Sequence, residues 1–137
     1  MRVARGGDYR VSTKDPAASW LRGTLPLALA AILARGDQHG YALVQELAAR
    51  GFGAVRGGAL YPVLGRMEAD GLVEARWEPG DGGPGRKVYR VTEAGRARLT
   101  EEAGSWQQFS AAMDHLLKTD TSDTSDTSDT SDTKESS

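Results

Sequence analysis

A proline inside an apolar stretch with helical spacing constrains this chain more than any other feature. Between Arg56 and Gly71 the apolar residues recur at i, i+3, i+4 and i+7, which is the spacing of one helical face. Pro62 has no backbone N–H, so it fits only in the first turn of a helix. We therefore predict a helix that begins near Ala59 and ends at Gly71, with these residues on its buried face: Leu60, Val63, Leu64 and Met67.

The opposite face of this helix has no bulky aliphatic side chain. It carries small, aromatic or cationic residues: Ala59, Tyr61, Pro62, Gly65 and Arg66. A helix with one buried face and one small, cationic face suits the major groove of DNA. An ordinary surface helix fits this stretch alone about as well, so the flanking elements must decide.

A first helix is expected to begin at Thr24 as N-cap, with Pro26 in its first turn. Residues 25–34 include no polar side chain, which predicts a helix buried on all sides. One small domain can hardly cover such a helix. We therefore expect a second copy of the chain to contact Leu25 and Leu29.

A second helix is expected from His39 to Gly51, and two strands follow the third helix. Residues 73–78 alternate in polarity and residues 86–91 form a second strand, with a Gly- and Pro-rich loop between them. Three helices followed by strand, loop and strand are typical of a winged helix-turn-helix domain. The wing would place Arg86 and Lys87 beside the third helix. The side chains predicted to point inward from its first strand are Val73, Ala75 and Trp77.

No enzymatic site is expected. Residues 80–85 match the pattern GxGxxG, but the dinucleotide fingerprint requires a helix next, and here a strand follows. The only histidines, His39 and His115, have no partner at the spacing of a metal site or of a nucleophile–base pair, and cysteine is absent. We expect no catalytic residue, no metal and no cofactor, and we interpret residues 80–85 as the loop of the wing.

A long last helix is predicted over residues 93–118, capped by Thr92. About 25 residues make a rod of roughly 37 Å, too long for one small domain to cover. We therefore expect it to pair with its own copy. Trp106 is either an aromatic residue of this seam or, with its copy, the wall of a slot for a planar aromatic effector. The other apolar residues predicted for the dimer contact are Leu99, Phe109, Met113, Leu116 and Leu117.

Charge and composition divide the chain into four segments. We predict a flexible arm over residues 1–19, the DNA-binding domain over 20–92, the dimerisation helix over 93–118 and a disordered Thr-Ser-Asp repeat over 119–137. Residues 1–118 hold 16 Lys and Arg against 13 Asp and Glu, whereas residues 119–137 hold Lys134 against five Asp and Glu135. The globular part is thus mildly basic. No segment approaches the roughly 18 apolar residues of a membrane span, and no signal peptide is apparent, so we expect a cytoplasmic protein with no membrane partner.

Five segments, taken together and in this order, resemble the PadR family of transcriptional regulators. They are residues 21–25 (LRGTL), 39–43 (HGYAL), 60–62 (LYP), 64–73 (LGRMEADGLV) and 85–95 (GRKVYRVTEAG). The resemblance implies a mostly α, α+β fold: a winged helix-turn-helix domain with a long C-terminal dimerisation helix. It also implies a homodimer that binds a palindromic operator on double-stranded DNA, usually as a repressor. In one multidrug-sensing member, a tryptophan just after a serine in this helix stacks on flat drugs, and Ser105-Trp106 is similar in position. The family usually has Ser or Thr where Ala59 stands, a hydroxyl that would cap the third helix.

Taken together, the residue patterns and the resemblance assign the DNA contacts to the third helix and the wing. Pro62 and Gly65 would allow close approach of the helix to DNA. The alternative is a winged-helix protein-interaction module that does not bind DNA. The side chains expected to contact DNA are Tyr61, Arg66, Arg86 and Lys87, with Tyr41 and Arg56 as weaker candidates.

Overall fold

The computed structural model describes residues 16–80 and 82–121. They form two compact units, one that ends at Thr100 and one that begins at Glu101. Helix α5 contributes to both, and each unit is described by itself. The elements in chain order are α2 (Pro16–Leu33), β1 (Gln38–His39), α3 (Gly40–Ala49), α4 (Gly57–Ala69), β2 (Val73–Glu78), β3 (Arg86–Val91) and α5 (Glu93–Thr121).

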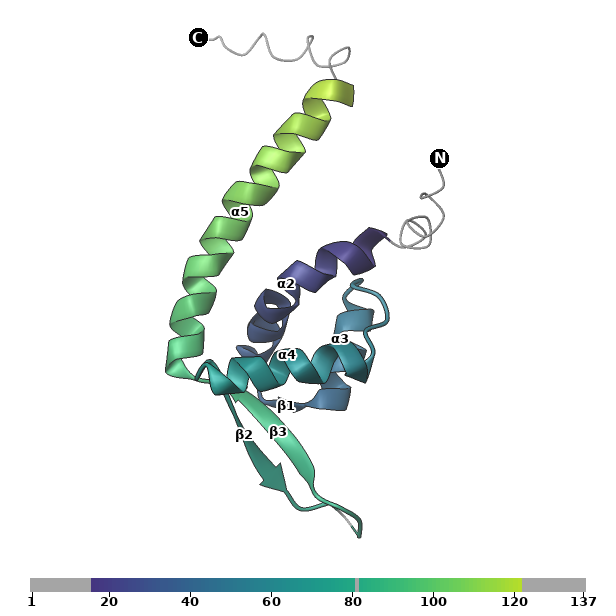
Figure 1. Ribbon diagram of the computed structural model, residues 1–137, viewed down its shortest axis with the longest axis vertical. Coiled ribbons are helices and arrows are strands. Elements are labelled where there is room, and N and C mark those ends of the chain that lie inside the picture. Colours follow the sequence, from purple (N-terminus) through teal and green to yellow (C-terminus); the bar gives the residue numbers. More distant parts are fainter. Residues whose placement is uncertain (1–15, 81, 122–137) are drawn as a thin grey trace, which may run out of the picture. The chain divides into compact units, whose positions relative to one another are not determined.

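The core of the first unit lies where α2, α3 and α4 meet (Figure 1). Each helix contributes leucines at helical spacing, and those side chains are removed from solvent together. Burial of a leucine contributes about 1.5–3 kcal/mol, so this cluster is the main source of stability for the unit. The largest fully buried side chains are Leu29, Leu33, Leu43, Leu47, Leu60, Leu64 and Val73.

Helix α2 begins at Pro16, eight residues before the predicted N-cap at Thr24, so that prediction is wrong. Pro26 lies inside the helix rather than in its first turn. The Thr24 hydroxyl donates back to the carbonyl oxygens of Trp20, at 3.2 Å, and Leu21, at 3.4 Å. A threonine with such a bond is compatible with a helix interior, and this removes the reason to start a helix there.

The prediction that Leu25 and Leu29 contact a second copy is also wrong. Their side chains are 3% and 0% exposed within a single chain. The three-helix arrangement and the sheet already cover this side of α2, so these leucines belong to the core of one protomer. Leu99 is half-buried against the same core.

Helix α4 begins at Gly57, two residues before the predicted start, and Arg56 is its N-cap. Ala59 is thus the third helical residue, and the backbone N–H of Ala59 donates to the carbonyl oxygen of Arg56 at 2.9 Å. A hydroxyl at position 59 would therefore not be the N-cap that the sequence suggested. At the other end Gly71 has a φ of +77°, the left-handed conformation predicted for the residue after this helix.

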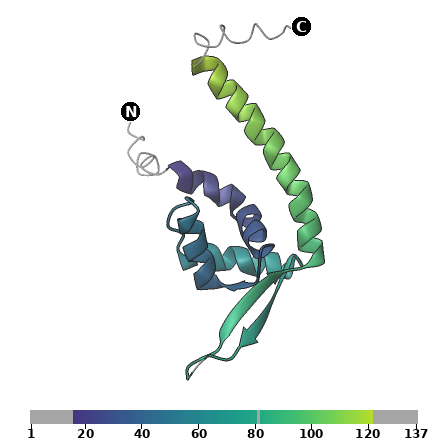
Figure 2. The same ribbon diagram turned by 180° about the vertical axis from the view of Figure 1, so that it is seen from behind.

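The three strands form an antiparallel sheet in the order β1-β3-β2. Strand β1 has only two residues, pairs Gln38 with Tyr89, and was not predicted. The β2–β3 hairpin is the predicted wing, and it extends beyond the helices when seen from either side (Figures 1 and 2).

Trp77 was predicted to point into the core, and this prediction is wrong. Its side chain is 70% exposed, whereas Val73 on the same strand is 1% exposed. Trp77 pairs with Lys87 near the far end of the hairpin. No helix covers that part of β2, so the side chain that the alternation directs inward has no core to pack against.

The start of α5 is fixed to the first unit. The Gly95 N–H donates to the Thr92 hydroxyl at 3.0 Å, which confirms the predicted cap. Gly95 itself is buried: a Cβ there would overlap the Leu72 carbonyl oxygen and lie 2.7 Å from Cγ2 of Val91. Glycine is required because the helix backbone touches the chain that leaves α4.

The predicted arm and tail lie largely outside the described residues. Helix α2 takes in residues 16–19 of the arm, and α5 continues to Thr121, three residues past its predicted end. Within the described part of the chain, no helix is long and apolar enough to cross a membrane.

Candidate nucleic-acid interface

Helix α4 has the two faces that the sequence predicts. Leu60, Leu64 and Met67 are at most 4% exposed, and Val63 is half-buried. All five residues of the opposite face are exposed to solvent. This division leaves a small, polar face of the helix free for another molecule: Ala59, Tyr61, Pro62, Gly65 and Arg66.

Two glycines make room for the ring of Tyr61. A Cβ at Gly40 would lie 2.6 Å from Cζ of Tyr61, and one at Gly57 would lie 3.2 Å from Cε2. The ring therefore rests against the first residue of α3 while the side chain as a whole remains 47% exposed. The sequence singled out Tyr61 but gave no signal that Gly40 sets its position, because the two residues belong to different helices.

Three arginines on or beside this surface are not held in ion pairs within the described chain. Arg56, Arg66 and Arg86 are exposed, and none forms an ion pair with another residue of the described chain. They come from the N-cap of α4, its last turn and the first residue of β3. A guanidinium without a carboxylate partner is available for a phosphate or a base edge.

Lys87 differs from these arginines. Its Nζ lies 3.5 Å from Oε1 of Glu68 and 5.6 Å from the centroid of the Tyr89 ring. Burial raises the pKa of the Tyr89 phenol, and the nearby Lys87 ammonium opposes that shift. The ion pair neutralises much of the charge that was predicted to reach DNA, so Lys87 is a weaker candidate than Arg86.

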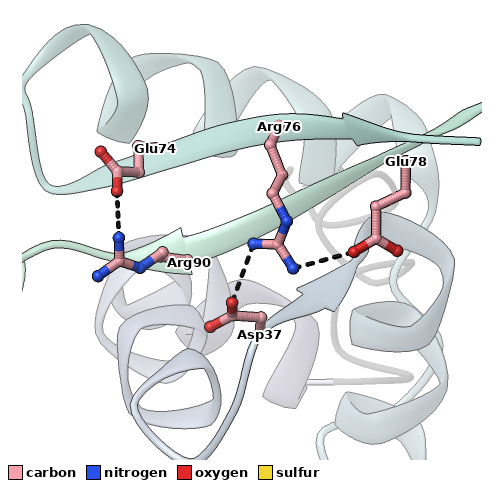
Figure 3. Close-up of polar contacts among 5 residues, drawn as sticks. All are labelled: Asp37, Glu74, Arg76, Glu78 and Arg90. Carbon is pink, nitrogen blue, oxygen red and sulfur yellow. Dashed lines mark hydrogen bonds and ion pairs between the residues drawn. The ribbon is translucent and has the colours of Figure 1, made fainter.

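The other cations of the wing are also paired (Figure 3). The Arg76 guanidinium donates to Asp37 and to Glu78 at 3.0 Å each, and Arg90 donates to Glu74. The hydrogen bond with Asp37 is the main cause of a raised pKa for Arg76. Exposed pairs of this kind contribute little to stability, because solvent screens them. Their larger consequence is electrostatic, because they leave Arg86 as the wing cation without a partner among the described residues.

Two further predicted residues, Tyr41 and Trp106, are on other helices, α3 and α5. Tyr41 is 64% exposed in the first turn of α3. Trp106 lies in the second unit, where its ring centroid is 5.8 Å from that of Phe109. The apolar side chains that continue this face of α5 are exposed: Phe109, Met113, Leu116 and Leu117.

The wing loop has the geometry of a tight turn. A Cβ at Gly80 would overlap the Pro84 carbonyl oxygen, and one at Gly85 would lie 2.8 Å from the carbonyl oxygen of Glu78. These glycines allow the loop to close on itself and are followed by β3, not by a helix. Among residues 16–80 and 82–121, no three His, Cys, Asp or Glu side chains gather as a metal site would require.

Comparisons with known proteins identify the family. A family model described as the transcriptional regulator PadR-like family matches residues 29–101. A transcriptional regulator of Mycobacterium tuberculosis is 44% identical over 77 residues, which are 56% of this chain and 70% of that protein.

Solved structures agree with this match. A PadR family transcriptional regulator from Eggerthella lenta is 34% identical, has a TM-score of 0.70, and covers 85% of this chain and 99% of its own. A PadR-like transcriptional regulator from Bacillus cereus is 33% identical, with a TM-score of 0.66 and coverage of 73% and 97%. This chain therefore belongs to the PadR-like family, whose members are winged-helix, DNA-binding transcriptional regulators.

Proposed function

We propose that this chain is a homodimeric repressor that binds a palindromic operator, with α4 in the major groove and the wing on the adjacent backbone. The observation that carries the proposal is the division of α4. One face is in the core, and the other is small, exposed and ends in Arg66, which has no ion-pair partner in the described chain. A helix of this shape can enter a groove about 12 Å wide without loss of core packing.

The proposed DNA contacts are assigned to exposed side chains of α4, the wing and α3. Arg66 and Tyr61 would reach a base edge and a phosphate from α4, Arg86 would meet the backbone from the wing, and Arg56 a phosphate at the start of α4. Tyr41 would add a hydroxyl from α3. Lys87, paired with Glu68, would contribute less.

A salt titration of operator binding tests this assignment. Each phosphate neutralised releases counterions, so the logarithm of affinity should fall with that of salt by about 0.9 per contact. Arg86→Ala should weaken binding to every sequence and reduce the slope by about one per chain. Lys87→Ala is the matched comparison on the neighbouring residue, and its slope should change less.

Arg66→Ala distinguishes base reading from backbone contact. Its loss should cost about 1–3 kcal/mol per half-site and relax preference at one base position. A flat salt dependence, or three folded variants that bind as the wild type does, would contradict DNA binding at this surface and favour the protein-interaction alternative.

We also propose that the homodimer places two Trp106 side chains near each other as the walls of a slot for a planar aromatic effector. The exposed Trp106–Phe109 pair supports this, since two aromatic rings already lie at stacking distance. Release of DNA would require the effector to bind the two dimer states unequally.

Tryptophan fluorescence tests the slot with ethidium as the flat aromatic probe. Binding should quench the emission, and Trp106→Phe should abolish most of the quenching while it preserves the dimer. Trp20 and Trp77, 71% and 70% exposed, serve as internal controls. Trp106→Ala removes the aromatic ring altogether, and unchanged probe affinity in a dimeric Trp106→Ala variant would exclude the slot.

A further inference from the structure

A carboxylate lies on the face of α4 that is proposed to meet DNA. Glu68 follows Tyr61 by two turns of the helix, which places it about 20° from Tyr61 around the helix axis. The Glu68 side chain is 39% exposed. A carboxylate there would repel the phosphates that the neighbouring cations attract. Attraction to DNA therefore does not explain why an acidic residue stands at this position.

The stability of α4 does not explain the position of Glu68 either. The residue lies in the last turn of the helix, where the partial negative charge of the helix end favours a cation rather than a carboxylate. Lys87 of β3 offsets the charge, because its Nζ lies 3.5 Å from Oε1 of Glu68. This ion pair joins α4 to the wing and neutralises a wing cation beside the DNA-facing surface.

A second contact of Lys87 lies near the limit of the cation–π range. Its Nζ is 5.6 Å from the centroid of the Tyr89 ring, and such contacts extend to about 6 Å. The ring is fixed, because Tyr89 is 5% exposed and pairs with both β1 and β2. The lysine is not fixed in this way, since its ammonium is carried on a flexible stem of four carbons. Without the Glu68 carboxylate, the ammonium would be able to turn from the ring toward a phosphate.

We propose that Glu68 is a specificity-determining residue, which withholds Lys87 from DNA phosphates and so limits binding to sequences other than the operator. This inference rests on the function proposed above, because it requires α4 and the wing to lie on DNA. Non-specific binding comes almost entirely from phosphate contacts, so a neutralised cation lowers it directly. On random DNA no base contact is at stake, and the protein can shift until a free ammonium reaches a phosphate. On the operator, base contacts restrict this shift, so a free Lys87 would gain less there.

A salt titration of the full chain on a random-sequence duplex tests the proposal with Glu68→Gln, which keeps the size of the side chain and removes its charge. The freed Lys87 should add one phosphate contact, so the logarithm of affinity should fall more steeply with that of salt, by about 0.9 per chain. For a decrease of about fourfold in salt concentration, the affinity of the variant should therefore rise about 3.5-fold more per chain than that of the wild type. Operator affinity should rise less, so the ratio of operator to random-duplex affinity should fall.

Two further variants identify the cation that is released. Lys87→Gln added to Glu68→Gln removes the freed ammonium and should return the slope to the wild-type value. Glu74→Gln changes the net charge by the same amount but breaks the pair between Glu74 and Arg90. Arg90 is three residues after Lys87, an odd spacing that puts it on the other face of the sheet. The slope of Glu74→Gln should therefore stay at the wild-type value.

Several outcomes would overturn the role of Glu68. They are an unchanged slope in Glu68→Gln, a steeper slope that persists without Lys87, an equally steep slope in Glu74→Gln, and an equal gain in affinity on operator and random DNA. Arg86→Ala in the same titration distinguishes this inference from the proposed function. If Arg86→Ala lowers the slope and Glu68→Gln leaves it unchanged, only the role of Glu68 is refuted. If neither variant changes the slope, the wing contact of the proposed function fails as well.

Discussion

Met113→Asp is expected to convert the protein from a dimer to a monomer and to weaken operator binding by about 10²- to 10⁴-fold. Met113 is 43% exposed on the face of α5 that also carries Trp106 and Leu116. In the proposed dimer the substitution would bury a carboxylate from each copy in an apolar seam, which is unfavourable unless it is paired. Without the dimer, the second half-site no longer adds to the affinity of the first, and that gain is commonly of this size.

Ala111→Asp is the matched control. Ala111 is exposed in the same helix but two residues away, a rotation of about 200° that puts it on the opposite face. Both variants add one aspartate to the helix, and Ala111→Asp should lower its intrinsic stability at least as much as Met113→Asp, because alanine is the better helix former. Molar mass from light scattering and affinity from fluorescence anisotropy provide the two measurements. A dimeric Met113→Asp variant with full operator affinity would place the contact between copies elsewhere.

The sequence predicted the elements of the fold whose signals are local. Pro62, Gly71 and the leucines of α4 fix a helix by spacing and backbone chemistry, and Thr92 fixes the start of α5 by its cap. Each of these depends on residues within a few positions of one another. The structure agrees with all of them to within two residues.

The wrong predictions for Trp77 and for Leu25 and Leu29 depend on residues that are distant in the sequence, whereas the wrong helix start at Thr24 came from a local signal. Trp77 alternates correctly along β2, but whether it is buried depends on where the helices end relative to the hairpin. Leu25 and Leu29 lie in an apolar helix that one small domain was not expected to cover completely. The structure covers them with segments from α3, α4 and the sheet.

The sequence predicted which residues lie on the candidate interface better than it predicted which of their charges are neutralised by ion pairs. Spacing placed Tyr61, Gly65 and Arg66 on one exposed face, as the structure has them. The sequence could not distinguish Arg86 from Lys87, because Glu68, which pairs with Lys87, is on α4 and distant from β3 in the sequence.

Gly65→Gln is expected to stabilise the free protein and to weaken operator binding strongly, two effects of opposite sign. Gly65 is an exposed glycine inside α4, and a Cβ there would meet nothing within 4 Å. Glutamine is a good helix former, so the free energy of unfolding should rise by about 0.5–1 kcal/mol. In a DNA complex the longer side chain would hold α4 away from the base edges. Loss of one contact of about 1–3 kcal/mol in each half-site corresponds to a decrease of more than about 30-fold.

Gly104→Gln separates the two effects. Gly104 is also an exposed helical glycine with open space around its Cβ position, but it lies in α5, on the face opposite Met113. It should give a similar rise in stability in urea unfolding and leave operator affinity unchanged. If Gly65→Gln unfolded at higher urea and still bound the operator as the wild type does, α4 would not lie in the groove. A decrease in affinity without loss of stability would support contact between Gly65 and the DNA, because a single chain has room for the longer side chain.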